Sequence, residues 1–151
     1  MTAAVAVRPA VPADVPALRE LATAAYQRYV TRIGRPPAPM TADYAALVRD
    51  GAVWVADVDG AVGGLLVLLV RDDHLLVDNV AVRPELQGHG VGGALLAFAE
   101  TTARAHGRPE LRLYTNAAMT ENLAYYARRG WTETHRATSD GFSRVYFHKP
   151  A

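Results

Sequence analysis

Four glycines within six residues form the part of this 151-residue sequence best suited to chemistry. The segment, called the glycine loop below, consists of Gln87, Gly88, His89, Gly90, Val91, Gly92 and Gly93. Glycine has no side chain to keep an anion away from the backbone. The first amides of a helix lack internal partners and carry the positive end of its dipole. A helix that begins in this segment therefore predicts a pyrophosphate-binding loop.

The elements on either side of the glycine loop place it at one edge of a sheet. Residues 74–82 and 111–115 have the pattern of strands, and residues 90–106 have an apolar stripe at helical spacing. Strand, helix and strand in this order form a right-handed crossover with two parallel strands. Ligands of such sheets bind beyond the carboxyl ends of the strands, which is where the glycine loop falls.

The rest of the chain predicts antiparallel hairpins and three further helices. Strands 53–58 and 62–70 flank Asp59-Gly60, and strands 131–136 and 142–148 flank Asp140-Gly141, dipeptides that favour tight turns. A strand is expected over 3–7 and helices over 12–29, 42–50 and 119–129, with Thr41 capping the second helix. The predicted fold is mixed α/β (α+β), with a mostly antiparallel twisted sheet of about six to seven strands, four helices and a central β-α-β crossover. A single domain over residues 1–151 is expected.

Composition and charge exclude several classes of protein. With 50% hydrophobic and 21% charged residues, the sequence is that of a globular domain and not of a fibre or a disordered tail. The absence of cysteine excludes disulfides, thiolate zinc sites and a cysteine nucleophile. A net charge of +1 gives no field that attracts nucleic acid or an anionic membrane. We therefore expect no nucleic-acid partner and no membrane partner. The five histidines lack metal-ligand spacing, so we also expect no metal.

Location is inferred from two stretches of sequence. The apolar run 61–70 is about half the roughly 20 residues that a membrane helix needs, so we expect a buried strand there. Residues 1–10 lack a basic stretch followed by a long apolar one, so no secretion signal is expected. A cytoplasmic protein is the resulting expectation.

The glycine loop has two other interpretations. Gly88, Gly90 and Gly93 match the dinucleotide pattern Gly-x-Gly-x-x-Gly, which normally follows a strand directly and precedes an acid by about 20 residues. Here residues 83–87 intervene, and the candidate acid, Glu110, opens the next strand instead of ending it. Alternatively, one glycine, Gly93 above all, only lets the helix pack closely against the sheet.

Three ordered motifs resemble the GNAT superfamily of N-acetyltransferases. Gln87, Gly90 and Gly92 match its signature of Arg or Gln, two residues, Gly, one residue, and Gly or Ala. The strand end Val-Ala-Val-Arg-Pro-Glu at 80–85 and the segment Asn-Leu-Ala-Tyr-Tyr-Ala-Arg-Arg-Gly-Trp at 122–131 are also typical of the family. The resemblance covers most of the chain. It implies the GNAT fold, acetyl-CoA as co-substrate, and transfer of the acetyl group to an amine.

The resemblance also implies roles for residues near the thioester. The family pattern assigns pantetheine binding to backbone groups of Val80 and Val82, and an amide near Val82 to the oxyanion. It places Asn122 against the pantetheine arm, although this side chain also suits a helix terminus. It makes Tyr126 the acid that protonates the leaving sulfur, although Tyr126 also lies on an apolar helical stripe. Tyr125 points about 100° away and is the weaker candidate.

The acceptor side has fewer signals. Asp78 lies near where many family members carry a glutamate that takes the amine proton, and its shorter side chain favours a bridging water. Alternatively, Asp78 holds a loop and Asn79 faces inward. The candidate acceptor-binding residues are Tyr26, Tyr29, Arg32 and Tyr114. The arginine is either a carboxylate receptor or solvated, and the tyrosines either bind the acceptor or pack in the core.

These features predict an N-acetyltransferase that moves the acetyl group of acetyl-CoA to the primary amine of a small molecule, by direct attack in a ternary complex. The lack of cysteine agrees with direct attack. Two alternatives stay open: acetylation of a protein amino terminus or lysine, and an acyl-CoA-binding sensor that has lost catalysis. The closing hairpin offers edges of the kind the family uses for dimers, so a homodimer is a further expectation.

Overall fold

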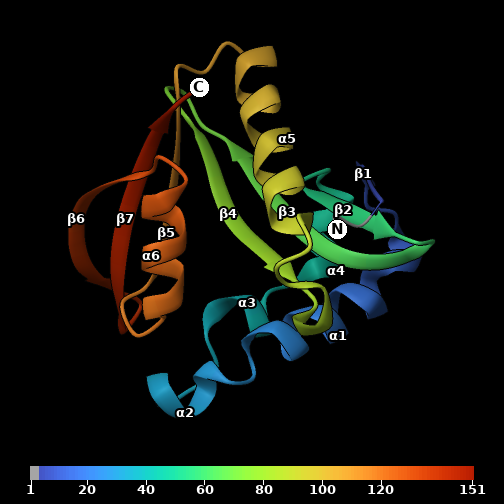
Figure 1. Ribbon diagram of the computed structural model, residues 1–151, viewed down its shortest axis with the longest axis horizontal. Helices are drawn as coiled ribbons and strands as arrows, with labels where there is room; N and C mark the ends of the chain where they lie inside the picture. The colour runs from blue at the N-terminus through green and yellow to red at the C-terminus, as the bar shows by residue number, and fades with distance from the viewer. Residues whose placement is uncertain (1–3) are drawn as a thin grey trace.

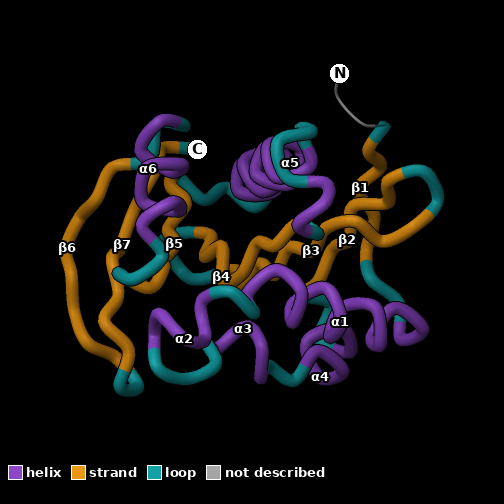
Figure 2. Tube along the Cα trace, turned by 60° about the horizontal axis from the view of Figure 1, so that its bottom comes forward, coloured by secondary structure: helices purple, strands orange, loops and turns teal. Residues whose placement is uncertain are grey.

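Seven strands form one sheet that helices cover on both faces (Figures 1 and 2). The structure, a computed structural model, describes residues 4–151. In chain order the elements are β1 (Val5–Pro9), η1 (Pro12–Asp14, a 3-10 turn), α1 (Val15–Tyr26), α2 (Tyr29–Ile33), α3 (Ala38–Thr41), α4 (Tyr44–Arg49), β2 (Val53–Val58), β3 (Ala61–Val70), β4 (Leu75–Val82), η2 (Pro84–Leu86, a 3-10 turn), α5 (Val91–Ala105), β5 (Glu110–Asn116), α6 (Thr120–Arg128), β6 (Thr132–Ser139) and β7 (Phe142–Pro150).

The sheet has the order β1-β2-β3-β4-β5-β7-β6, and its one parallel pair is β4 with β5, joined by α5. The predicted mixed, mostly antiparallel fold with a central crossover is therefore confirmed. Both predicted hairpin turns form, with Asp59 and Asp140 at φ 51° and 53° and the glycine after each also left-handed. The strand predicted over 3–7 starts at Val5, and Ala3 lies outside the described residues.

The segment before β2 differs from its prediction. Residues 4–151 contain six α-helices and not four, because residues 12–49 form α1 to α4 instead of two helices. The predicted helix 12–29 ends at Tyr26, after which the Val30 amide donates to Gln27 three residues back and tightens the chain into a turn. Thr41 does not cap α4, since it ends α3; the cap is Asp43, whose carboxylate accepts the Ala46 amide at 3.1 Å.

The two faces of the sheet bury separate apolar cores. Alternation along the strands sends Leu66 of β3 toward α5 and α6, and its neighbour Leu65 toward α1 and α4. Figure 2 shows α5 and α6 on one side of the sheet and α1 to α4 on the other. Because both faces are covered, the strands in the middle of the sheet are rigidly held.

A β-bulge in β4 opens the middle of the sheet. Val67 of β3 pairs with Asn79 and Leu68 pairs with Val77, so Asp78 is the extra residue. Bulges bend a strand and increase its twist. The parallel ladder between β4 and β5 accordingly stops at Val77, and beyond that point the two strands diverge (Figure 1). The last five residues of β4 therefore have a free edge where β5 would otherwise lie.

Helix α5 packs closely against Gly64 of β3, which gives a stability prediction. A Cβ atom there would lie 3.0 Å from side-chain carbons of both Val91 and Leu95. We expect Gly64→Val to lower the free energy of unfolding by about 2 kcal/mol, because overpacking moves α5 away from β3. Urea unfolding measures the change. Ala61→Val, at the exposed start of the same strand, should leave stability almost unchanged; equal stability of the two variants would contradict this packing.

Candidate active site

The free edge of β4 presents the backbone groups of Val80 and Val82. The Arg83 amide donates to the Gly63 carbonyl at 2.9 Å, which fixes the hydrogen-bonding phase of the β3–β4 pair. Because bonded and non-bonded pairs alternate along antiparallel strands, Val80 and Val82 occupy non-hydrogen-bonded positions. Their N–H and C=O groups therefore point away from β3, toward the space that β5 has left. Both carbonyls already accept a side-chain hydrogen bond, that of Val80 from the Tyr26 hydroxyl at 3.1 Å and that of Val82 from Gln87 Nε2 at 3.3 Å. The predicted role of the two residues in binding pantetheine stays a prediction.

The glycine loop leads into α5 with the geometry of an anion site. Gly88 and Gly90 have φ values of 82° and 89°, a left-handed conformation that favours glycine. The helix begins with the Ala94 amide donating to the Gly90 carbonyl, so the amides of residues 91–93 lack acceptors within α5. The amide of His89 is already used, donating to Leu86, and its side chain is exposed. The loop can thus bind an anion through backbone amides.

Side chains of α6 lie over the start of α5. A Cβ atom at Gly92 would lie 2.9 Å from the Tyr125 hydroxyl oxygen, and one at Gly93 would lie 3.3 Å from the Arg129 guanidinium. The expectation that Gly93 packs the helix against the sheet is wrong, because a Cβ atom at Gly93 would meet only Arg129 and no residue of the sheet. Val91 contributes only its amide, since its side chain is buried in the core.

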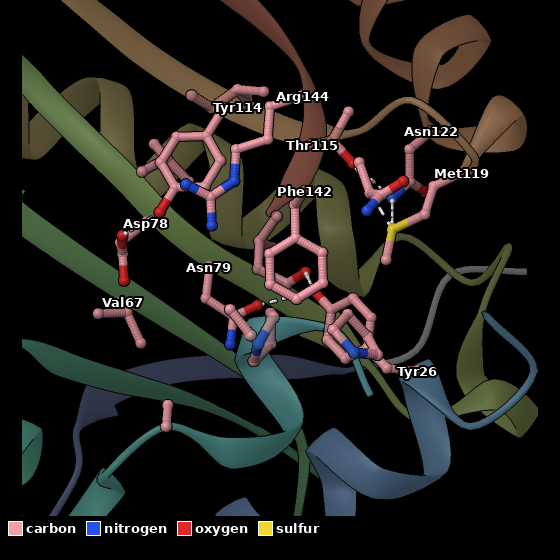
Figure 3. A pocket seen from close by; sticks show the side chains of 18 of the residues that line it. Tyr26, Val67, Asp78, Asn79, Tyr114, Thr115, Met119, Asn122, Phe142 and Arg144 are labelled. Carbon is pink, nitrogen blue, oxygen red and sulfur yellow. Dashed lines mark hydrogen bonds between the residues drawn. The ribbon is translucent and has the colours of Figure 1, made fainter. Parts of the chain in front are cut away.

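Two cavities meet along the free edge of β4. The larger one, the loop cavity, has a volume of about 670 Å³ and is lined by the glycine loop, α1 and α6, including Gln87, Arg128 and Arg129. The smaller one, the inner cavity, has a volume of about 140 Å³ and lies between β4, the end of β5, α3 and the start of β7 (Figure 3). Four residues line both cavities: Tyr26, Val80, Asn122 and Tyr126. Arg128 and Arg129 were not predicted as site residues, since only the fold brings α6 next to the loop.

Tyr126 combines a packed ring with a hydroxyl at the junction of the two cavities. The ring contacts Trp131 and Phe147, and the residue is 7% exposed. Its hydroxyl makes no hydrogen bond to any residue of 4–151, and it stays accessible from the cavities. Burial raises the pKa of the phenol above its ordinary value, so the proton is retained at neutral pH. Both readings of Tyr126 from the sequence, core packing and a reactive hydroxyl, thus fit the same residue.

Asn122 faces the junction and does not cap α6. Its amide nitrogen lies 3.4 Å from the Thr115 hydroxyl and 3.5 Å from the Met119 sulfur. The turn before the helix is instead held by Asn116, whose side chain accepts the Ala118 amide at 2.9 Å. Asn122 therefore keeps its carbonyl oxygen free of protein hydrogen bonds within the described residues and can serve a ligand.

A buried polar network fixes the wall of the inner cavity. The Tyr26 hydroxyl donates to Asn79 Oδ1 at 2.7 Å and also lies 3.1 Å from the Val80 carbonyl oxygen, while Asn79 Nδ2 donates to the Tyr44 hydroxyl at 3.0 Å. Asn79 is thus the inward-facing residue on the α1 side, a role that the sequence left open between it and Asp78. Burial raises the pKa of the Tyr26 phenol well above its ordinary value. Neither tyrosine of this network was recognised as part of it from the sequence.

Asp78, the bulged residue of β4, also lines the inner cavity. One of its carboxylate oxygens accepts a hydrogen bond from the Tyr114 hydroxyl at 3.2 Å. Burial and the charge of Asp78 raise the pKa of the Tyr114 phenol, so this hydroxyl stays a donor. Asp78 therefore has one oxygen held in place and faces the cavity that Tyr114 also lines.

The remaining predicted acceptor residues lie elsewhere. Tyr29 lines the loop cavity, and its hydroxyl accepts from Arg28 at 2.6 Å. Arg32 lines neither cavity and is paired with Glu121, at 2.6 Å. This hydrogen bond lowers the pKa of Glu121 to about 2. The structure thus gives Arg32 a carboxylate partner from its own chain, which the sequence could not reveal because 89 positions separate the two residues.

No group of three or more His, Asp or Glu side chains within residues 4–151 is arranged to hold a metal ion. No helix of that part of the chain is both long and apolar enough to cross a membrane.

The site combines a free strand edge, an anion-binding loop at the start of a helix, and a small cavity beside both. This combination is typical of a group-transfer enzyme with an extended, phosphorylated co-substrate. The chain belongs to the acetyltransferase (GNAT) family, whose sequence model matches residues 15–131. The dinucleotide interpretation of the glycine loop is therefore wrong. Its candidate acid, Glu110, is held by Arg112 at 2.6 Å, at the start of β5.

Solved structures of N-acetyltransferases are similar to this chain over nearly its whole length. PaiA N-acetyltransferase from Thermoplasma acidophilum, in complex with coenzyme A, is 16% identical with a TM-score of 0.80, over 98% of this chain and 99% of that one. The ribosomal-protein-S18-alanine N-acetyltransferase from Escherichia coli is 20% identical with a TM-score of 0.76, over 97% and 94% of the two chains. Nourseothricin acetyltransferase is 27% identical with a TM-score of 0.74, over 97% and 98%. No curated protein matches the sequence.

Proposed function

We propose that this enzyme transfers the acetyl group of acetyl-CoA to the primary amine of a small molecule. The observation that carries the proposal is the junction at Tyr26, Val80, Asn122 and Tyr126, where a cavity next to an anion-binding loop meets a small second cavity. Family membership and the coenzyme A complex of a similar structure support acetyl-CoA as the donor.

The loop cavity has groups that match each part of acetyl-CoA. The amides of residues 88 and 90–93, with the guanidinium groups of Arg128 and Arg129 nearby, suit its phosphates. The Val82 N–H, on the edge of β4 that faces away from β3, suits a carbonyl of the pantetheine arm, which would extend along β4 as an added strand. The carbonyls of Val80 and Val82 would have to share with this arm the hydrogen bonds that they accept from Tyr26 and Gln87. The Asn122 side chain can both donate to and accept from the same arm. When bound, acetyl-CoA supplies an activated acetyl thioester at the junction.

The residues at the junction supply the proton transfers that acetyl transfer needs. The lone pair of the amine attacks the thioester carbon and a C–N bond forms. The oxygen that becomes negative is stabilised by the Val80 N–H and not by the amide near Val82 that the family resemblance implies, because Val80 lines both cavities and Val82 only the loop cavity. The C–S bond then breaks with its electron pair on sulfur, and the Tyr126 hydroxyl donates a proton to that sulfur. Asp78 takes the proton that the amine nitrogen loses, through a water molecule, because its side chain is short. The proposal needs no covalent enzyme intermediate.

The size of the inner cavity supports a small acceptor. A protein cavity of similar volume, about 150 Å³, holds a benzene molecule. The inner cavity, at about 140 Å³, therefore suits a group of roughly this size next to the reacting amine. A small molecule fits inside almost entirely, whereas only one side chain or terminal residue of a protein would enter.

Initial-rate kinetics test direct transfer in a ternary complex. Release of free thiol is followed while the concentrations of acetyl-CoA and of an amine acceptor are both varied. Direct attack predicts double-reciprocal lines that intersect, and an enzyme whose intact mass is unchanged after incubation with acetyl-CoA alone. Parallel lines together with an acetylated enzyme would contradict the proposal.

The raised pKa of Tyr126 predicts the shape of the pH profile. A general acid must be protonated to work, and burial raises the pKa of this phenol above its ordinary value of about 10. We therefore expect kcat to rise as the amine loses its proton and then to stay high up to a pH of about 10, with no loss from Tyr126 below that point. Rates of thiol release between neutral and alkaline pH measure this. A descending limb with a midpoint near pH 8 or 9, absent in Tyr126→Phe, would contradict the assignment.

A further inference from the structure

We propose that the acceptor amine carries a carboxylate group and that Arg144, at the start of β7, binds this carboxylate in the inner cavity. The inference rests on the proposed function, because it names the acceptor class of the same site. It concerns a residue that the acetyl-transfer steps do not use.

The Arg144 side chain is enclosed by the aromatic walls of the inner cavity. It is only 10% exposed, and it lines the cavity together with Tyr114 and Phe142. Its guanidinium carbon lies 4.4 Å from the centre of the Tyr114 ring and 5.6 Å from that of Phe142. Figure 3 shows the guanidinium in front of the Tyr114 ring, between Asp78 and Phe142. Contacts of this kind with aromatic faces favour the charged guanidinium and restrict its movement.

Arg144 lacks the carboxylate partner that a buried cation normally has. Within residues 4–151, the one carboxylate within 4.0 Å of its guanidinium is that of Asp140, at 3.8 Å. That distance is too long for a hydrogen bond, and Asp140 is 84% exposed, so the pair contributes little. No buried side-chain nitrogen of the described residues lacks a partner, so the guanidinium nitrogens of Arg144 remain accessible from the inner cavity that they line. An anion in that cavity can therefore reach them and form a charge-assisted pair with them.

Other charged groups near Arg144 leave its inner side available. Asp78 is held by the Tyr114 hydroxyl and is not within ion-pair distance of Arg144. Arg35 stacks on the Phe142 ring at 3.6 Å and is engaged by the Asp140 carbonyl oxygen, which keeps it out of the cavity lining. The inner cavity is therefore lined by one free cation, Arg144, among the described residues.

A carboxylate fits this arrangement better than other groups. A guanidinium presents parallel N–H donors whose spacing matches the two oxygens of a carboxylate. Asp78, at the hydroxyl end of Tyr114, provides the opposite charge, which suits an ammonium group before it loses its proton. With a cavity of about 140 Å³, amine and carboxylate must lie a few bonds apart, as in an amino acid.

Matched acceptors test this inference. Thiol release from acetyl-CoA is measured with a set of amino acids and with the corresponding amino-acid amides, which keep the amine but lack the negative charge. We expect kcat/KM to favour the amino acids by about 100-fold in the wild type. Arg144→Gln should remove most of this preference by lowering the rate for amino acids only, with the KM for acetyl-CoA unchanged. Arg144→Lys should restore part of it, because it returns the charge without the bidentate geometry.

The controls separate the possible failures. Arg136→Gln removes the same charge from the exposed strand β6, where Arg136 pairs with Glu133, and should leave the preference intact. If the wild type acetylates amides as fast as amino acids, or if Arg144→Gln lowers both rates equally in a folded protein, the inference is overturned while acetyl transfer stands. If neither set of amines releases thiol although coenzyme A binds, the proposed function fails and this inference fails with it.

Discussion

Replacing Tyr126 with phenylalanine is expected to lower kcat by about 100-fold or more while the KM for acetyl-CoA changes little. The variant removes only the hydroxyl at the junction of the two cavities, which has no protein partner within residues 4–151. The leaving thiolate then has to take its proton from water. Because the ring keeps its contacts with Trp131 and Phe147, the melting temperature should stay close to that of the wild type.

Tyr125 provides the matched control for this variant. Its ring packs edge-on against Tyr126, but its hydroxyl lies next to Gly92 at the start of α5, and it lines only the loop cavity. Tyr125→Phe should therefore retain kcat within about threefold of wild type. Equal kcat values for the two variants, or a larger loss in Tyr125→Phe, would refute the role of Tyr126 as the acid.

The second large effect is expected at Gly90. A valine there would be strained at a φ of 89° and would place a branched side chain at the start of α5, beside the amides proposed to bind the phosphates. In the wild type, coenzyme A at 100 times its Kd should stabilise the fold by about 2.7 kcal/mol, a rise in Tm of roughly 5–10 °C. Gly90→Val should abolish this rise. Thermal unfolding with and without coenzyme A measures it.

Gly107 separates loss of binding from loss of stability. It lies just beyond the other end of α5 with a φ of 67° and open space where a Cβ atom would be. Gly107→Val should thus carry a similar backbone strain and lower the Tm without ligand, yet keep the coenzyme A shift. A full shift in Gly90→Val would show that phosphates bind elsewhere.

The sequence predicted those parts of the fold that depend on local chemistry. Asp59-Gly60 and Asp140-Gly141 form the expected turns because few other residues adopt two consecutive left-handed conformations. The glycine loop was located for the same reason. The division of the predicted helix 12–29 after Tyr26 was missed, since the apolar pattern continues through Tyr29 and only the tertiary contacts of the two tyrosines require a break.

The acceptor side of the site was less predictable because it depends on pairs of residues far apart in the chain. Arg32 was proposed as a carboxylate receptor, but Glu121 already occupies it. Arg144 was not considered, since the alternating pattern of residues along β7 does not distinguish it from a solvent-facing arginine. Its enclosure by Tyr114 arises only once β5 and β7 pair. Likewise, nothing local indicated that Asp78 would be the bulged residue that opens the sheet.

The most direct test of the central claim is to quantify both products of one reaction. The enzyme is incubated with acetyl-CoA and a panel of small amines that includes amino acids, and free thiol and N-acetylated amine are measured over time. Acetyl transfer at the junction predicts that the two products appear in equal amounts with at least one amine, and that both fall together in Tyr126→Phe. Binding of coenzyme A without formation of either product would contradict the account and identify a sensor of the co-substrate instead of an enzyme.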